Sequence, residues 1–166
     1  MLRGWINAIR RNHGLEHATV TVLFERYGAQ RIAGRAGENG FFIIGDVDLE
    51  VLDECAREAL NRIQQGQREL VVSPLCGTNI LITGFLTAAV VLGTEHRTKR
   101  QSRGDTFINA ATFAMLATIA SQPIGSWLQR FVTTSSDIDR LEIVDTRQLF
   151  PGLKKVFTRE TSVSKS

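Results

Sequence analysis

Two stretches without any charged residue dominate the hydropathy pattern of this chain. They run from Leu70 to Thr94 and from Thr106 to Gln129. Each is longer than the roughly 20 residues that a helix needs to cross a hydrocarbon core about 30 Å thick. Apolar residues are densest from Ile80 to Leu92, whereas Pro123 interrupts the second stretch. We therefore predict a membrane hairpin over residues 70–129. The alternative is a pair of buried helices in a soluble helical bundle.

The region before this hairpin, residues 1–69, begins with a helical pattern. From Trp5 to Tyr27, apolar residues recur at the spacing of one helix face, and Gly28 supplies a stop signal. When this apolar stripe is continued along the helix, it includes His13 and then Glu16 or His17. We therefore expect the helix to bury these polar residues.

The rest of the N-terminal region predicts a β-hairpin and a second helix. Residues 31–36 and 40–44 flank the turn sequence Gly37-Glu38-Asn39-Gly40, which is typical of a hairpin. Apolar residues then repeat at helical spacing from Asp48 to Gln65. Together these elements predict an N-terminal α+β domain over residues 1–69.

The C-terminal part, residues 130–166, predicts little regular structure. Arg140–Thr146 has the pattern of a short strand, Pro151-Gly152 marks a turn, and Thr161–Ser166 forms a polar tail. The predicted fold class is therefore α+β, a small helix–β-hairpin–helix domain on a two-helix transmembrane hairpin with a short C-terminal extension.

Composition argues against nucleic acid as a partner. The 20 basic and 17 acidic residues leave a net charge of only +3. One basic cluster is local, at Arg97, Lys99, Arg100 and Arg103, and no aromatic residues interleave with it. The expected partners are instead the lipid bilayer and a protein partner or peptide substrate.

The candidate chemistry lies in His13-Gly14-Leu15-Glu16-His17, which uses two of only three histidines in the chain. Residues four apart share one helix face, so both imidazoles can reach a single metal ion. This H-x-x-E-H order is the inverted form of the zincin motif and is found in inverzincin metallopeptidases. Glu16 would then serve as general base beside the metal. The alternative is a polar network in the protein core.

A zinc site needs a third protein ligand, and Cys76 is the first candidate. It precedes an apolar helix, where a thiolate is stabilised by the helix dipole. Cys76 could equally be a small packed residue at the helix entrance, or a nucleophile paired with a histidine. Glu25 is a second candidate ligand, whereas His96 lies at the far end of the predicted membrane helix and Cys55 on the apolar side of the second helix.

The two blocks Arg11-x-His13-x-Leu15-Glu16-His17-Ala18-Thr19 and Cys76-Gly77-Thr78-Asn79 resemble a family of uncharacterised membrane proteins from cyanobacteria and Chloroflexi, a domain of unknown function. They are also similar to blocks of the YqhQ-like family of predicted metal-dependent membrane proteins. That family has lysine at the position of Ala18 and a shorter segment between the blocks. The resemblance covers roughly residues 10 to 92 and implies that His13, Glu16, His17 and Cys76 form one site.

The function expected from these features is a membrane-bound, metal-dependent hydrolase, peptidase-like, with zinc held by His13, His17 and Cys76. The alternative is a non-catalytic, metal-stabilised membrane subunit or assembly factor of a larger complex. We expect a multi-pass cell-membrane protein with both termini and the metal site in the cytoplasm. The basic loop Glu95–Asp105 favours the opposite orientation, but that would require the N-terminal region to be translocated without a signal peptide.

Overall fold

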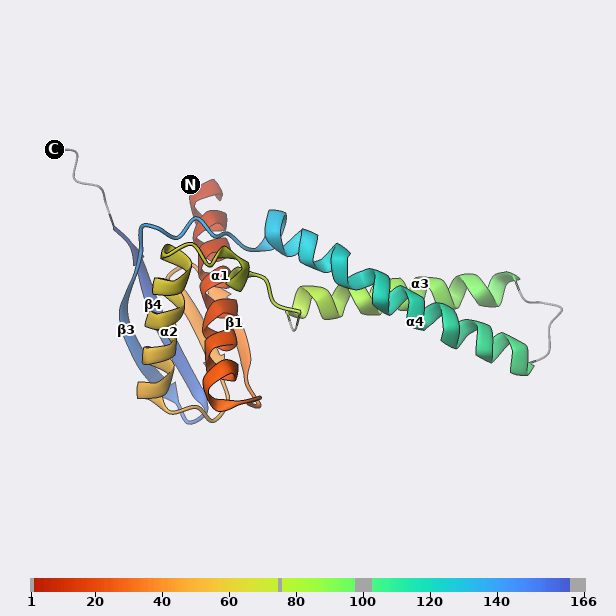
Figure 1. Ribbon diagram of the computed structural model, residues 1–166, viewed down its shortest axis with the longest axis horizontal. Coiled ribbons are helices and arrows are strands. Elements are labelled where there is room, and N and C mark those ends of the chain that lie inside the picture. Colours follow the sequence, from red (N-terminus) through yellow and green to blue (C-terminus); the bar gives the residue numbers. More distant parts are fainter. Residues whose placement is uncertain (1, 75, 98–102, 162–166) are drawn as a thin grey trace. The chain divides into compact units, whose positions relative to one another are not determined.

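A computed structural model describes residues 2–74, 76–97 and 103–161 of the chain (Figure 1). The chain divides into two compact units. The α/β unit contains the chain up to Ser73 together with the part from Arg130 onward, and the helical hairpin contains Pro74–Gln129. The basic residues Lys99 and Arg100 and the predicted tail beyond Thr161 lie outside the described residues.

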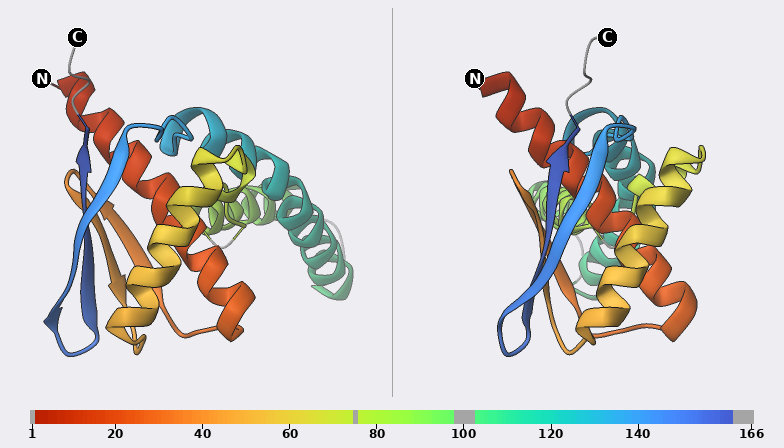
Figure 2. Two further views of the ribbon diagram at one scale, coloured as in Figure 1. Left: turned by 60° about the vertical axis from the view of Figure 1, so that its left-hand side comes forward. Right: turned by 90° about the vertical axis from the view of Figure 1, so that its left-hand side faces the viewer.

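The α/β unit alternates helices with pairs of strands. Its elements in chain order are α1 (Leu2–Tyr27), β1 (Ala33–Gly37), β2 (Gly40–Ile44), α2 (Leu49–Gln64), the short 3-10 helix η1 (Arg68–Val71), β3 (Leu141–Phe150) and β4 (Leu153–Glu160). The strands form one antiparallel sheet in the order β1-β2-β4-β3. Both helices cover the same face of this sheet (Figure 2). The α+β class predicted from the sequence is therefore confirmed.

The predicted N-terminal elements are confirmed, and local signals explain where they end. Gly28 has a φ of 74°, a left-handed conformation that glycine adopts without strain, and α1 stops one residue earlier. Asp48 caps α2 by accepting a hydrogen bond from the backbone amide of Glu50, at 2.9 Å. Trp5 and Ile6 are about half exposed, so the first turns of α1 extend beyond the core.

The core of the α/β unit lies between the helix pair and the sheet. Its largest fully buried side chains include Leu15 and Leu23 of α1, Phe41 and Ile43 of β2, and Leu52 of α2. These residues come from the predicted apolar faces of both helices and from one face of the sheet, as alternation along a strand requires.

The C-terminal extension is more structured than its sequence predicts. The expected short strand extends to ten residues as β3, and β4 was not predicted at all. The alternation along β4 is hidden because Lys154 and Thr158 occupy positions that face the core, beside the apolar Val156. In the structure β4 pairs with both β2 and β3, so it completes the centre of the sheet.

The helical hairpin consists of α3 (Gly77–Arg97) and α4 (Arg103–Leu128), and a π-helical turn, η2 (Gln129–Thr133), follows α4. The predicted start of the first span at Leu70 is wrong, because Leu70 and Val71 are buried in the core of the α/β unit. The chain then passes Pro74 before α3 begins. Among the described residues, one helical stretch, Gly104–Thr133, is long and apolar enough to cross a membrane, whereas the apolar part of α3 covers only Gly77–Gly93. A hairpin of two spanning helices is therefore not confirmed.

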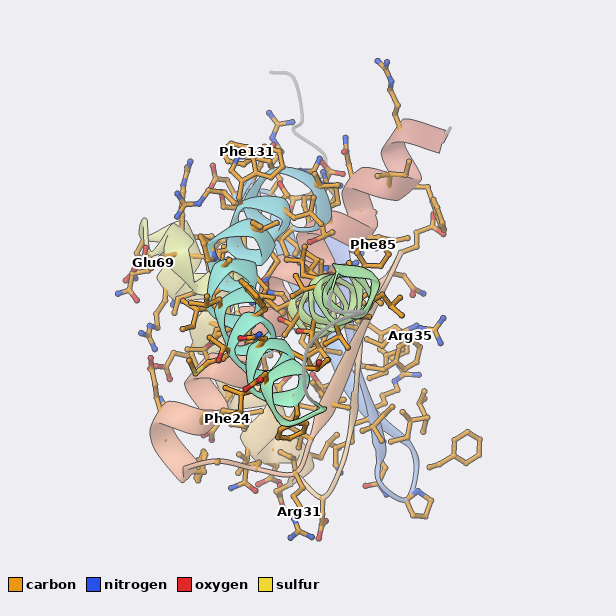
Figure 3. The ribbon with its side chains drawn as sticks, turned by 90° about the vertical axis from the view of Figure 1, so that its right-hand side faces the viewer. Phe24, Arg31, Arg35, Glu69, Phe85 and Phe131 are labelled. Atoms are coloured by element: carbon orange, nitrogen blue, oxygen red, sulfur yellow. The ribbon has the colours of Figure 1, made fainter. Side chains whose placement is uncertain are left out.

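Within the hairpin, several polar side chains are buried and many large apolar side chains are exposed. Asn79 and Ser121 are almost fully buried, and the hydroxyl groups of Thr83 and Ser121 are 2.6 Å apart. By contrast, Phe85 on α3 and Phe107 on α4 are 74% and 75% exposed (Figure 3 shows Phe85). This distribution is the reverse of that in the α/β unit.

Candidate metal centre

The centre of α1 carries the two histidines of the predicted motif. Because His13 and His17 are four residues apart on this helix, their rings lie one above the other. The ring centroids are 4.4 Å apart, and the ring planes meet at 61°. His17 is buried and His13 is half-buried. The helix alone therefore brings two potential metal ligands together.

Backbone carbonyl groups orient both imidazoles. His13 Nδ1 lies 3.0 Å from the carbonyl oxygen of Thr133, and His17 Nδ1 lies 2.8 Å from that of Val71. A carbonyl oxygen can only accept a hydrogen bond, so each Nδ1 must carry the proton and donate it. In the neutral ring the lone pair is then on Nε2. Histidine ligands of metals typically have this arrangement.

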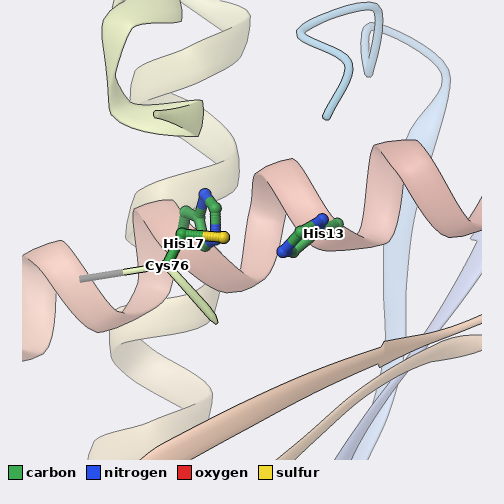
Figure 4. A group of neighbouring side chains, drawn as sticks. All are labelled: His13, His17 and Cys76. Carbon is green, nitrogen blue, oxygen red and sulfur yellow. The ribbon is translucent and has the colours of Figure 1, made fainter. Parts of the chain in front are cut away.

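Cys76 completes a group of three potential ligands (Figure 4). The ligand atoms of His13, His17 and Cys76 all lie within 4.8 Å of one another, and Cys76 is buried. Only four residues lie between Cys76 and Val71, whose carbonyl group binds His17, so the chain itself keeps the cysteine near this histidine. This His/His/Cys group could hold a metal ion.

The donor set fits zinc by chemistry and by size. Zinc takes imidazole nitrogens and cysteine thiolates as ligands, at distances that separate neighbouring ligand atoms by roughly 3.5 Å in a tetrahedral site. The observed limit of 4.8 Å therefore requires a contraction of at most about 1.3 Å around an ion. Three protein ligands leave one position of a tetrahedron for water or substrate.

Glu16 is buried, but it does not belong to the group of three ligands. Its carboxylate lies directly over the backbone of Gly34 on β1, where the Cβ atom of any other residue would overlap it. The sequence predicts that Glu16 lies beside the metal. In the structure its carboxylate packs against Gly34 of the sheet. Gly34 therefore determines where this carboxylate can lie.

The remaining candidates lie elsewhere. Glu25 forms an ion pair with Arg62 at 2.6 Å and is not in the ligand group. Cys55 is fully buried in the core of the α/β unit, and this burial raises the pKa of its thiol. His96 belongs to the last turn of α3, and its side chain lies outside the described part of the chain.

Three contributors to the site could not be found in the sequence. The carbonyl groups of Val71 and Thr133 are backbone atoms, which carry no residue-specific signal, and Thr133 is 120 residues from His13. Gly34 lies in an alternating strand pattern, where an isolated glycine signals only a close approach of some other group. The tertiary structure shows that this group is Glu16.

Comparison with known proteins places the chain in a family. Residues 8–146 match the family model described as "Domain of unknown function (DUF6391)". An uncharacterized protein of Picosynechococcus sp. (strain ATCC 27264 / PCC 7002 / PR-6) is 31% identical over 136 residues. The alignment covers 76% of this chain and 66% of that protein, slightly under two thirds of its length. No solved structure matches the chain.

The matched region includes both sequence blocks on which the resemblance was based. The predicted similarity to an uncharacterised cyanobacterial family is confirmed at this level, and the wider similarity to the YqhQ-like family stays a prediction. The chain belongs to the DUF6391 family.

Proposed function

We propose that this protein is a membrane-anchored, zinc-dependent hydrolase that acts on peptides. One observation carries the proposal. Two histidines with carbonyl-bound Nδ1 atoms converge with a buried cysteine, so that three ligand atoms lie within 4.8 Å. A three-ligand set with one open position is typical of catalytic zinc, whereas structural zinc sites have four protein ligands.

In this proposal each residue has a separate role. His13, His17 and Cys76 hold the metal, and the carbonyl groups of Val71 and Thr133 fix the orientation of the two imidazoles. Zinc, when bound, supplies a Lewis acid and lowers the pKa of a water in the open position towards neutrality. Glu16 would act as the general base, accepting a proton from the attacking water.

The membrane anchor of the proposal is the helical hairpin, with both α3 and α4 crossing the bilayer. Its support is that only 11% of the apolar window in Gly104–Thr133 is buried, unlike the core helix of a soluble protein. The tails of lipids would cover the exposed side chains of both helices. Because the apolar part of α3 is short, we expect local thinning of the bilayer or a tilt of α4.

We also propose that the metal site faces the cytoplasm. Single cysteines at Ser102 and Ser164, in a background without Cys55 and Cys76, test this with an impermeant thiol reagent on intact cells. Labelling of the cysteine at position 102 alone is expected. Labelling at position 164 alone would show the reverse orientation.

A second candidate function is a metal-stabilised, non-catalytic subunit of a larger membrane complex. The position of Glu16 favours it, because this carboxylate packs against Gly34 and is not in the ligand group. In that case Glu16 would be a structural residue of the α1–β1 interface, and the metal would only fix the segments around Val71 and Thr133.

Metal content and peptide cleavage, measured in mild detergent, separate these functions. For the hydrolase we expect about one equivalent of zinc in the wild type and in Glu16→Gln, with cleavage of a fluorogenic peptide library lost only in the variant. Glu25→Gln, on the same helix, is the matched control and should cleave normally. Bound zinc without cleavage in any of the proteins would favour the subunit. Absence of metal with rapid alkylation of Cys76 would favour a cysteine–histidine nucleophile.

A further inference from the structure

A cavity lies in the α/β unit, where the β3–β4 turn meets the start of α2. Its volume is about 710 Å³. Figure 2 shows this turn and the start of α2 at the same end of the unit. The cavity is lined by residues of the loop before α2, of its first turn and of the strand ends, including Asp46, Asp48, Glu50, Gln148 and Lys154.

Lys154 is the residue that distinguishes this cavity from an ordinary acidic surface. It is only 5% exposed, because its position in β4 faces the helices. Within residues 2–74, 76–97 and 103–161 its ammonium group makes no hydrogen bond or ion pair. Its Nζ atom is not one of the fully buried polar atoms that lack a partner, so the ammonium group at the end of the buried stem stays accessible. Lys154 therefore presents an unpaired positive charge to the cavity that it lines.

Negative charges line the same cavity but do not neutralise this lysine. Asp46, Asp48 and Glu50 are exposed, and none of them lies within 4.0 Å of the ammonium group, the limit for an ion pair. The cavity thus offers one accessible ammonium group, on a largely buried side chain, and three separate carboxylates. A ligand with a single charge would be attracted by the lysine and repelled by the carboxylates, or the reverse. A zwitterion satisfies both.

A neighbouring cavity indicates the overall charge of the ligand. It has a volume of about 440 Å³ and shares Leu49 and Glu50 with the cavity that Lys154 lines. It adds the carboxylates of Asp53, Glu54 and Asp145, and one cation, Arg57. Asp53 binds Arg57 and Asp145 binds Arg147, whereas Glu54 has only a 4.0 Å contact with Arg26 and its side chain is 67% exposed, so Glu54 is the least neutralised of the three added carboxylates. A ligand long enough to extend into this neighbouring cavity would therefore carry a second cationic group, close to Glu54.

We propose that these adjoining cavities bind a cationic amino acid. Its carboxylate would pair with Lys154, its α-ammonium group with Asp46, Asp48 or Glu50, and its cationic side chain would extend towards Glu54. No bond is made or broken, so the site is a binding site. It is separate from the metal centre, because none of its lining residues is a metal ligand.

Calorimetric titration of the full chain in mild detergent tests this proposal, with L-arginine, L-alanine, L-glutamate and agmatine as probes. Agmatine is arginine without the carboxylate. We expect L-arginine to bind at least about tenfold more tightly than agmatine or L-glutamate, with L-alanine between. Lys154→Met keeps the packed stem of the side chain but removes the charge. It should lower the affinity for L-arginine about tenfold and leave agmatine unaffected.

Lys155→Met is the matched control, since the adjacent residue lies on the opposite face of β4, over Phe42 and Phe157. It should bind L-arginine like the wild type.

A circular dichroism melt verifies that each variant is folded. If Lys154→Met does not fold, Lys154→Arg, which keeps the charge, should retain binding. The proposal is overturned if folded wild type shows no binding of L-arginine at ~10 mM, if agmatine binds as tightly as L-arginine, or if folded Lys154→Met binds L-arginine normally.

Discussion

The α/β unit and the helical hairpin distribute apolar residues in opposite ways. In the α/β unit the large apolar side chains are inside, and Leu15, Phe41 and Ile43 are completely buried. In the hairpin many of them are outside, and the buried residues include the polar Asn79 and Ser121. Burial of apolar surface therefore accounts for the folding of the first unit, whereas many large apolar side chains of the second remain exposed.

This comparison explains why similar hydropathy leads to different structural roles. Leu70 and Val71 belong to the same charge-free stretch as α3, yet they pack in the core of the α/β unit. The boundary between the two environments falls near Pro74, inside the stretch. Hydropathy alone does not distinguish a residue that packs against protein from one that faces lipid.

The largest expected effect is a difference between two phenylalanine-to-alanine substitutions. Phe41→Ala should lower the unfolding free energy of the α/β unit by about 3–5 kcal/mol, because it leaves a cavity in a closed core. Phe85→Ala should change that free energy by less than about 0.5 kcal/mol. Denaturant titration in detergent measures both. Equal losses would contradict the contrast between the units.

Removal of metal should have the next largest effect. His17→Ala should abolish stoichiometric zinc binding, as should a strong chelator. If free zinc is present at 1,000 times its dissociation constant, the loss of binding lowers the unfolding free energy by about 4 kcal/mol. Thermal melts with and without chelator measure this loss. A His13→Ala/His17→Ala variant that retains one equivalent of zinc would exclude this site.

A charge on the outer surface of the hairpin gives a third test. Phe85→Arg should disfavour membrane insertion by about 2.5–3.5 kcal/mol if position 85 lies near the bilayer centre. Glycosylation-based insertion assays measure this change. The control is Gln148→Arg in the α/β unit, which should not affect insertion. Normal insertion of Phe85→Arg would indicate that α3 does not face lipid.

The smallest expected effect concerns pH and the contact between α2 and β3. Burial raises the pKa of Asp53, but hydrogen bonds from Arg57 and Thr146 and the charge of Arg57 outweigh it and lower the pKa below the ordinary value of 3.8. A lowered folded pKa stabilises the protein above the unfolded pKa, and the gain is lost as pH falls through the folded pKa.

Asp53→Asn should therefore cost less than about 1 kcal/mol at pH 7. The difference from wild type should disappear as the pH falls below 3.8. Denaturant titrations over this pH range measure it. A cost that does not vary with pH would assign the effect to packing.

A single substitution links the candidate site to the sheet. Gly34→Ala should displace the carboxylate of Glu16, because an added Cβ atom would overlap it. Zinc content should remain near one equivalent, while peptide cleavage should fall about as far as in Glu16→Gln if Glu16 is the general base. Loss of zinc from Gly34→Ala would instead show that the position of α1 depends on this contact.

The sequence by itself determined α1, the β1–β2 hairpin, α2 and the pair of histidines on one helix face. These features depend on spacing within about 20 residues and on local stop and cap signals, which the sequence displays directly. The cysteine was predicted as a ligand from its place at a helix entrance, but its distance from the histidines was not fixed by any local rule.

Only the tertiary structure decided the remaining features. It placed β4 in the centre of the sheet despite Lys154, assigned Leu70 and Val71 to the core, and aligned the carbonyl groups of Val71 and Thr133 with the two imidazoles. It also placed the carboxylate of Glu16 over Gly34. Each of these outcomes depends on contacts between segments far apart in the chain, and the backbone atoms that make several of them are the same in every residue.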